Sequence, residues 1–313
     1  MTVAINPSIS TPSYIPPNTF ADYLSNQYHY CLFLDMDGTL ADFTLNPKDS
    51  AIPNATLTLL QKIQSHGVNV AIVTGRSLDE AKKMLSPLQL PIAATHGLEI
   101  AFDSKEDSDN NSSNSSDNIS VAHVDATELT TIRQRIIQSC LPYRDFTIEN
   151  KPYSVALHYR CDPTLADAAY TIMSTVLNHH SNWTLKQGKY VWEIMPKGAD
   201  KGTAILTLLK NMQVSEDLCP IFIGDDITDE AGFIAVQDKN GAKTVKTPQK
   251  TVKGMGIKVG DERTCAHYYV HSVHEVRVLL ESFLSFFQSH LTLPSDLADA
   301  HTSSIKNPMR HVI

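Results

Sequence analysis

Short apolar runs alternate with amphipathic stretches over most of the chain. The runs at 31–35, 68–74 and 220–224 are apolar almost throughout, which is typical of strands buried on both faces of a sheet. Between the first two runs, apolar residues recur at helical spacing over 54–67. Buried strands separated by helices predict an α/β core built on a doubly wound, Rossmann-like parallel sheet.

The pattern changes between about 120 and 192. The segments 154–160 and 189–195 alternate apolar and polar residues, which indicates a sheet with one solvent-facing side. Two stretches with helical spacing, at about 126–140 and 163–179, lie among these segments. A small α+β domain, inserted into the parallel-sheet core as a cap, is therefore expected here.

These patterns divide the chain into a core, an insertion and three further segments. The parallel-sheet core domain comprises residues 25–100 and 196–293, and the inserted α+β cap domain comprises residues 101–195. Residues 1–24 are polar and Pro-rich and are expected to form a flexible arm. Residues 103–118 form an acidic Ser/Asn tract that cannot bury apolar area, which predicts a disordered loop. The segment 294–313 is a polar tail.

Charge and composition exclude several kinds of partner. The formal net charge is −8 and there is no long basic run, so we expect neither nucleic acid nor an anionic membrane as a partner. No apolar run approaches the roughly 20 residues that span a bilayer. Residues 1–17 lack the basic start and apolar stretch of a signal peptide. The five cysteines show no C-x-x-C spacing and indicate reduced thiols, which favours a cytoplasmic location.

Residues capable of chemistry cluster at four predicted strand or helix ends. They are Asp35, Asp37, Gly38 and Thr39; Thr74, Gly75 and Arg76; Lys201; and Asp225, Asp226 and Asp229. Ligands of open α/β sheets gather at the carboxyl ends of the strands, so these groups are expected to share one crevice. Five carboxylates in one crevice are tolerable only with a lysine and a metal ion, and hard oxygen ligands favour Mg²⁺.

The positions of these residues suggest their roles. Asp35, at the strand end, is a candidate nucleophile that forms an aspartyl-phosphate, and Asp37 a candidate proton donor and acceptor. Thr74 and nearby backbone N–H groups can hold phosphoryl oxygens, and Lys201 can balance charge.

The metal would be held by Asp35, the backbone carbonyl of Asp37, and Asp225. Asp226 is a further candidate ligand, although it and Asp229 are placed better to orient waters or Lys201. Gly75 and Arg76 are candidate substrate contacts. The Arg76 guanidinium would either reach a phosphate or pair with Asp79 or Glu80.

At these residues the chain resembles the haloacid-dehalogenase superfamily of phosphatases, whose signature is DxDGT, a Thr or Ser, a Lys and GDDxTD. Here these stand as DMDGT at 35–39, Thr74, Lys201 and GDDITD at 224–229. The resemblance implies Mg²⁺-dependent phosphoester hydrolysis through an aspartyl-phosphate. Residues 38–73 are too few to hold a helical cap, whereas residues 75–200 leave room for a cap in the second position, as in the sugar-phosphate branch.

Charged residues also share faces of the predicted cap strands. If these segments are extended, the residues that lie on a common face are Glu149 with Lys151, His158 with Arg160, and Lys189 with Glu193. Charged groups make strong hydrogen bonds to hydroxyl groups. The pattern therefore suits a polyhydroxylated ligand, although solvated strand faces would look the same.

This cap pattern resembles the trehalose-6-phosphate phosphatases. In that family a Glu-x-Lys, an Arg nine residues after the Lys, and a later Lys-x-x-x-Glu hold the sugar hydroxyls. The residues at these spacings here are Glu149, Lys151, Arg160, Lys189 and Glu193. The resemblance implies hydrolysis of trehalose 6-phosphate to trehalose and phosphate, the last step of trehalose biosynthesis, alongside a separate synthase. It also implies a cap that closes over the disaccharide.

Two other interpretations keep the same core motifs. One is a different capped sugar-phosphate enzyme, acting on sucrose phosphate or mannosyl-3-phosphoglycerate or as a hexose phosphomutase. The other is a non-catalytic protein that binds a sugar phosphate. A pure binding protein has no need of a second aspartate that donates a proton, so Asp37 argues against the last interpretation.

Overall fold

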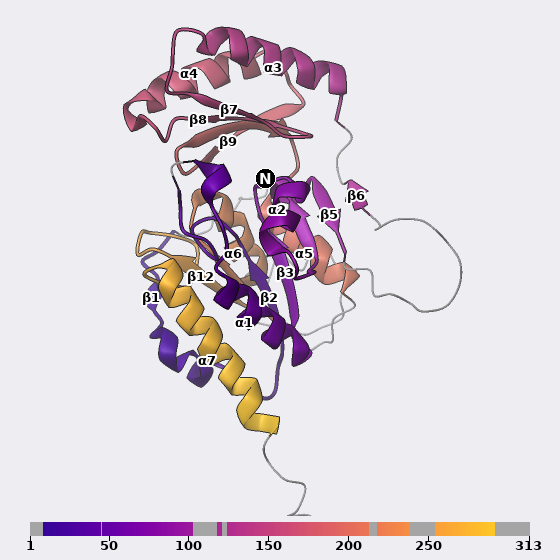
Figure 1. Ribbon diagram of the computed structural model, residues 1–313, viewed down its shortest axis with the longest axis vertical. Helices are drawn as coiled ribbons and strands as arrows, with labels where there is room; N and C mark the ends of the chain where they lie inside the picture. The colour runs from indigo at the N-terminus through magenta and orange to yellow at the C-terminus, as the bar shows by residue number, and fades with distance from the viewer. Residues whose placement is uncertain are drawn as a thin grey trace, which may run out of the picture.

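The computed structural model describes residues 9–44, 46–102, 118–120, 124–212, 218–237 and 254–291. Two sheets organise these residues, a large one in the core and a small one in the cap (Figure 1). Within this part of the chain, no helix combines the length and the apolar character that crossing a bilayer requires.

The core sheet has nine strands in the order β1-β13-β12-β11-β2-β3-β4-β5-β6. All neighbouring pairs from β1 to β4 are parallel, and β5 and β6 extend one edge in antiparallel pairing. The bounds are β1 Ser13–Tyr14, β2 His29–Leu34, β3 Asn69–Val73, β4 Ile92–Ala94, β5 Glu99–Ala101, β6 Asn118–Ser120, β11 Leu218–Gly224, β12 Met255–Val259 and β13 Tyr268–Val270.

Helices cover both faces of this sheet because its strands alternate apolar residues toward both sides. Leu32 and Leu34 of β2 pack in one cluster with α1, α2 and α7, whereas Cys31 and Phe33 pack on the opposite side with α5 and α6. The bounds are α1 Asn54–Ser65, α2 Leu78–Leu85, α5 Lys201–Asn211, α6 Glu230–Gln237 and α7 Val273–Leu291. The predicted doubly wound α/β core is confirmed.

The cap is a four-stranded antiparallel sheet in the order β7-β8-β10-β9 with two helices on its outer face (Figure 1). Its elements are α3 Ala126–Cys140, β7 Thr147–Asn150, β8 Val155–His158, α4 Ala166–Leu177, β9 Trp183–Gly188 and β10 Val191–Pro196. Ile132 and Met173 of the helices are fully buried against Val155 and Leu157 of β8. The inserted α+β cap predicted from alternation is thus present.

Alternation predicted that the opposite side of the cap sheet faces solvent. In the structure this side is buried instead. His158 on β8 and Glu193 on β10 are 6% and 4% exposed, because this side lies over the core. Alternation reports one polar side of a sheet, and a polar side can face either water or another domain across a crevice.

The flexible arm predicted for residues 1–24 is wrong for residues 9–24. Strand β1 pairs in parallel with β13, and a 3₁₀ helix follows at Pro17–Tyr23. Ile15 and Phe20 are fully buried, and the Phe20 ring stacks on Phe283 of α7 at 6.2 Å. Two apolar side chains among polar ones are enough to dock the segment, because each contributes about 1.5–3 kcal/mol on burial. Residues 1–8 lie outside the described residues.

The predicted boundary at residue 101 is also wrong. Strands β5 and β6 pair with each other and with β4, so they belong to the core sheet and the cap follows them. The Ser/Asn tract interrupts this hairpin rather than the cap. Apart from Asn118, which begins β6, the predicted disordered loop at 103–118 lies outside the described residues, and so does the tail at 294–313.

Candidate active site

A crevice lies between the carboxyl ends of the parallel strands and the inner side of the cap sheet. The residues predicted as site residues all line it: Asp35, Asp37, Thr74, Gly75, Arg76, Glu149, Lys151, Arg160, Lys189, Glu193, Lys201, Asp225 and Asp226. The core supplies the four aspartates, and the cap supplies both glutamates and three of the five basic residues. The two domains therefore build one site jointly.

Asp35 follows β2, and its backbone N–H donates to the carbonyl of Ile223 on β11 at 3.0 Å. Lys201, at the start of α5, places Nζ 3.0 Å from Asp35 Oδ1 and 2.7 Å from Asp229 Oδ1. All three side chains are buried. Burial raises the pKa of Asp35 well above its usual value, opposed by Lys201 and reinforced by Asp229 and Asp225. The single positive charge of Lys201 therefore does not neutralise the negative charges of Asp35, Asp225 and Asp229.

Among the described residues, three carboxylates form a group that could hold a metal ion. Asp35, Asp225 and Asp229 each offer an oxygen within 4.8 Å of the others. Burial, followed by the charges of Asp229 and Asp226, raises the pKa of Asp225 to about 7. Gly38 has φ +76°, and a Cβ there would lie 2.1 Å from Asp225 Oδ2, so only glycine permits this approach. Several hard oxygen ligands in a buried, electron-rich space fit a divalent cation such as Mg²⁺.

The structure does not bring Asp226 into this group. Asp226 Oδ1 accepts hydrogen bonds from the N–H and the hydroxyl of Thr228, and so caps the 3₁₀ helix Ile227–Asp229. Asp229 takes its place: its Oδ2 accepts the N–H groups of Asp225 and Asp226, both at 2.9 Å. One helical turn after the strand end brings Asp229 back beside Asp35 and Asp225, where it is fully buried, whereas Asp226 lines the crevice and caps the turn itself.

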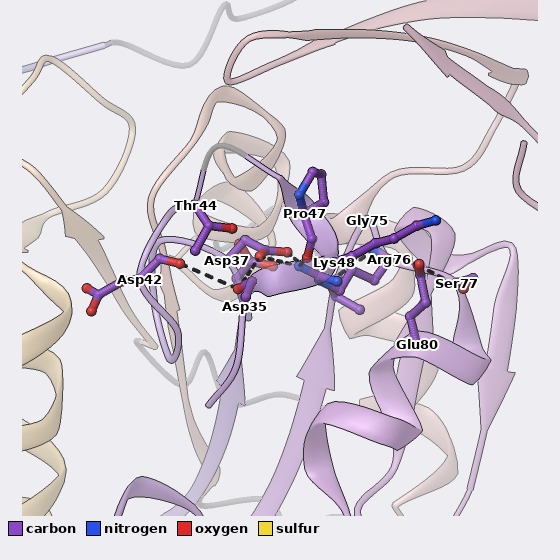
Figure 2. A network of polar contacts seen from close by, with 12 residues as sticks. Asp35, Asp37, Asp42, Thr44, Pro47, Lys48, Gly75, Arg76, Ser77 and Glu80 are labelled. Atoms are coloured by element: carbon purple, nitrogen blue, oxygen red, sulfur yellow. Dashed lines mark hydrogen bonds and ion pairs between the residues drawn. The ribbon is translucent and has the colours of Figure 1, made fainter. Parts of the chain in front are cut away.

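Asp37 and Arg76 form a two-pronged ion pair (Figure 2). Arg76 Nε donates to Asp37 Oδ2 at 2.6 Å and Nη2 to Oδ1 at 2.7 Å, and Nη2 also reaches the carbonyl of Pro47. Ser50 Oγ donates to Asp37 Oδ1 at 3.0 Å. The observed partner, Asp37, is neither of the two carboxylates, Asp79 and Glu80, that the sequence suggested for Arg76, and Glu80 accepts from Ser77. Arg76 thus holds Asp37 in one orientation, and its contact with a substrate phosphate stays a prediction.

Thr74 follows β3, and its buried hydroxyl accepts the backbone N–H of Arg76 at 3.2 Å. Thr74 and Gly75 line the same crevice as Asp35, as the strand order β2-β3 requires. A Cβ at Gly75 would come within 2.8 Å of His96 Cε1, so this position is kept small by its neighbour.

Lys151 and Glu193 form a buried ion pair on the inner side of the cap, with Nζ 2.9 Å from Oε2. Glu193 also accepts from Ser154 Oγ, and its Oε2 lies 3.5 Å from Nε2 of His96 on the core. Lys151 Nζ donates across the crevice to the carbonyl of Gly75 at 2.8 Å. Burial would raise the pKa of Glu193, but Lys151 and His96 hold it well below its usual value. The cap is therefore seated on the core through charged groups.

Two more charged cap residues reach the crevice, Glu149 from β7 and Lys189 from the turn between β9 and β10. Glu149 Oε2 lies 2.7 Å from Nε2 of His158, and burial, which would raise the pKa of Glu149, is outweighed by Lys151 and His158, which lower it. Lys189 Nζ lies 3.4 Å from Asp225 Oδ2. Lys189 thus adds positive charge beside the acidic group from the cap side.

Arg160 crosses from the cap to the loop that follows the first aspartates. Its Nη1 donates to the carbonyl of Thr44 at 2.7 Å, and its guanidinium carbon lies 4.4 Å from the centre of the Phe43 ring. Burial lowers the pKa of Arg160, against the attraction of Asp37 and Glu149, which raises it. A buried guanidinium with donors to spare suits a ligand rich in acceptor oxygens.

The family model described as trehalose-phosphatase matches residues 33–273, which include every site residue named above. The chain belongs to the trehalose-phosphatase family. This confirms the resemblance inferred from the motifs and makes the protein a phosphatase of the haloacid-dehalogenase type. The boundaries of the match span both domains, so the cap is part of what this trehalose-phosphatase family member shares with its relatives.

A named relative supports the family assignment, and solved structures support the fold. The trehalose-6-phosphate phosphatase of Escherichia coli is 30% identical over 261 residues, which cover 83% of this chain and 88% of the relative. The C-terminal domain of trehalose-6-phosphate phosphatase from C. albicans superposes with a TM-score of 0.70 at 19% identity, covering 90% of this chain and 99% of that domain. A haloalkanoate-superfamily phosphatase from Bacteroides thetaiotaomicron superposes with a TM-score of 0.52 at 13% identity, covering 84% and 96%. The solved structures support the fold of this trehalose-phosphatase family member.

Phe43, which lines the crevice, and Ser50, which donates to Asp37, have no sequence feature that would have marked them as site residues. Phe43 lies in a loop outside any periodic segment, and Ser50 is one of many serines in the chain. His96, by contrast, stands in the HGLE segment at 96–99 and directly after a predicted strand, which could have marked it. In this trehalose-phosphatase family member, loop residues join the site only through tertiary contacts.

Proposed function

We propose that this protein is a Mg²⁺-dependent phosphatase that hydrolyses trehalose 6-phosphate to trehalose and phosphate. One observation carries the proposal: Asp35 with Lys201, and Asp37 with Arg76, face a cap bearing the Lys151–Glu193 pair across a single crevice. Membership of the trehalose-phosphatase family and the name of the E. coli relative support the substrate.

In the first step, an oxygen of Asp35 attacks phosphorus, and the bond from phosphorus to the sugar oxygen breaks. Asp37 gives its proton to that oxygen, so trehalose leaves as an alcohol and Asp35 carries the phosphoryl group. In the second step Asp37 takes a proton from water, whose oxygen attacks phosphorus. Phosphate leaves, and the carboxylate of Asp35 and the protonated Asp37 are restored.

Lys201 and Thr74 stabilise this chemistry from the core. Lys201 Nζ lies 3.0 Å from Asp35 and can offset negative charge that develops on the phosphoryl oxygens. The hydroxyl of Thr74 lies at the end of the neighbouring strand, where it can donate to one of those oxygens.

Mg²⁺ would be held by Asp35, Asp225 and the backbone carbonyl of Asp37. Asp229, whose two oxygens accept from Lys201 and from the backbone, would add negative charge beside it. When bound, it would neutralise the carboxylates and the phosphoryl oxygens and act as a Lewis acid. The proposal for the metal rests on the three converging carboxylates. The raised pKa of Asp225, caused first by burial and then by Asp229 and Asp226, agrees with it.

The cap residues are proposed to hold the sugar hydroxyls: Glu149, Lys151, Arg160, Lys189 and Glu193. Because Lys151 also donates to the carbonyl of Gly75, the seated cap would exclude water from the phosphoryl group. We also propose that the protein acts in the cytoplasm on a sugar phosphate made by a separate synthase. The five cysteines, which show no C-x-x-C spacing, suit a reducing compartment.

The test is release of phosphate from a panel of sugar phosphates in the presence of Mg²⁺. We expect trehalose 6-phosphate to be hydrolysed with the highest kcat/KM and EDTA to abolish the reaction reversibly. A higher kcat/KM for sucrose phosphate or a mannosyl phosphate would transfer the assignment to that substrate. Release of phosphate from no ester would leave only a binding role.

A further inference from the structure

Phe43 lies on the core loop that follows β2, six residues after Asp37, and its ring lines the crevice. The loop is tied to the strand tip: Ala41 N–H donates to the carbonyl of Met36, and Ser50 Oγ to that of Asp42. The ring is therefore held at a defined place beside the acidic groups.

Two cations from the cap lie against this ring. The guanidinium carbon of Arg160 is 4.4 Å from the ring centre, and Lys189 Nζ is 5.0 Å from it. Both distances are within the range of cation–π attraction. Arg160 comes from the chain after β8 and Lys189 from the turn between β9 and β10, so two separate parts of the cap converge on one core side chain.

The cap turn that carries Lys189 is strained at this contact. Tyr190 has φ +59°, a conformation that a bulky side chain rarely adopts. Its ring lies 6.1 Å from that of Phe43. Such strain persists only where surrounding contacts impose it, and it concentrates at functional sites. Tyr190 lies in the two-residue turn between β9 and β10, and the rings of Phe43 and Tyr159 are its neighbours there.

An aromatic ring orients a cation without using its hydrogen-bond donors. Arg160 Nε is buried without a hydrogen-bond partner, although Nη1 donates to Thr44. A carboxylate at position 43 would accept these donors and neutralise the charge, whereas a ring face attracts the cation and leaves the N–H groups free. The contact thus prepares Arg160 and Lys189 for a ligand rich in oxygen atoms.

We propose that Phe43 is a positioning residue of the sugar site: its ring docks Arg160 and Lys189 when the cap is seated and aims them at the sugar hydroxyls. This inference rests on the proposed function and deepens it, because it assigns part of the substrate selectivity to a core residue. Phe43 acts through the two cations and takes no part in phosphoryl transfer.

The test compares Phe43→Leu, which keeps apolar bulk but removes the ring, with Phe43→Tyr, which keeps the ring. For trehalose 6-phosphate we expect Phe43→Leu to raise KM about tenfold with kcat within about twofold, the effect of losing two cation–π contacts. Phe43→Tyr should restore KM to within about threefold. With p-nitrophenyl phosphate, which lacks the sugar, all three proteins should match within about twofold. Phe146→Leu, the same change in the cap outside the crevice lining, is the control and should leave both substrates unaffected.

A double-mutant cycle with Arg160→Met separates positioning from packing. If the ring acts through Arg160, Phe43→Leu should raise KM by less than about threefold in the Arg160→Met background. Fully additive losses, equal losses on both substrates, or an unchanged KM in Phe43→Leu would each overturn the inference. Failure of the wild-type protein to hydrolyse trehalose 6-phosphate would instead refute the proposed function.

Discussion

Asp35 and Asp37 stand two residues apart and meet different surroundings. Asp35 is buried against Lys201, and Asp37 is partly exposed and held by Arg76 and Ser50. Lys201 opposes the effect of burial and favours the carboxylate form of Asp35 that attacks phosphorus, whereas Asp37 can exchange protons with the leaving group and water. The roles follow from the environment, since the two side chains are chemically the same.

Replacement of Asp35 by Asn should abolish turnover. An amide is a poor nucleophile, so we expect kcat to fall at least about 10³-fold, as for loss of other covalent nucleophiles. Phosphate release from trehalose 6-phosphate measures it. Asp42→Asn, the same change at an exposed position on the next loop, is the matched control and should stay within about twofold. Substantial activity in Asp35→Asn would exclude the covalent route.

Replacement of Arg76 by Lys should lower kcat although the charge is kept. Lysine cannot reproduce the two parallel hydrogen bonds to Asp37, so the proton donor loses its fixed orientation. We expect kcat to fall about 10- to 100-fold on both trehalose 6-phosphate and p-nitrophenyl phosphate. A rise in KM alone would indicate that Arg76 binds substrate directly.

At the scale of elements, the cap sheet and the core meet through Glu193, Lys151 and the backbone of Gly75. Both side chains are buried, and their contacts with the core, from Lys151 to the carbonyl of Gly75 and from Glu193 to His96, exist only while the cap is seated. The contact therefore couples the position of a whole sheet to two side chains. Sugar binding and cap seating should depend on the same groups.

Glu193→Gln should impair the sugar substrate selectively. The amide keeps the shape but leaves the Lys151 charge uncompensated, so we expect kcat/KM for trehalose 6-phosphate to fall about 100-fold or more. Turnover of p-nitrophenyl phosphate should fall by less than about fivefold. Equal losses on both substrates would show that Glu193 serves stability instead, which a melting curve of the variant would reveal.

The segment Pro17–Tyr23 should contribute to the stability of the core. Phe20 is fully buried against α7, and Phe20→Ala should reduce the free energy of unfolding by about 3–5 kcal/mol. Denaturant unfolding measures it. Tyr28→Ala, at an aromatic that is 45% exposed, should cost less than about 1 kcal/mol. Equal losses of unfolding free energy in the two variants would mean that the segment Pro17–Tyr23 does not pack on the core.

At the scale of the whole molecule, the acidic crevice makes the stability of the fold depend on pH and on bound metal. The pKa of Asp225 is raised to about 7, so without metal this carboxyl holds its proton in the folded state and loses it on unfolding between about pH 4 and pH 7. A raised carboxyl pKa contributes stability at low pH that is lost as the pH rises through about 7. The metal-free protein should therefore lose part of its stability over that range.

Mg²⁺ should reverse this loss. We expect millimolar Mg²⁺ to raise the melting temperature of EDTA-treated protein by about 5 °C at pH 7.5, assuming a concentration about 100-fold above Kd. The rise should be smaller at pH 5.5, where protons compete for the ligands. Asp225→Asn should abolish the rise. A rise that is larger at pH 5.5, or that survives in Asp225→Asn, would contradict the proposed metal site.

The sequence by itself determined the layered core, the inserted cap and the convergence of the site residues. Apolar runs can be buried only in a doubly covered sheet, and the carboxyl ends of its parallel strands necessarily meet at one edge. Asp35, Thr74 and Asp225 stand at such ends and Lys201 stands at the start of helix α5, so local pattern and topology were enough to bring them together.

Only the tertiary structure decided which side chains pair with one another. Arg76 pairs with Asp37 and not with Glu80, and Asp229, not Asp226, belongs to the carboxylate group. The Phe43 ring contacts two cations of the cap. These contacts join loops and domains, where no periodicity constrains the backbone and several partners of similar chemistry compete. Their outcome depends on distances and burial that exist only once the cap lies on the core.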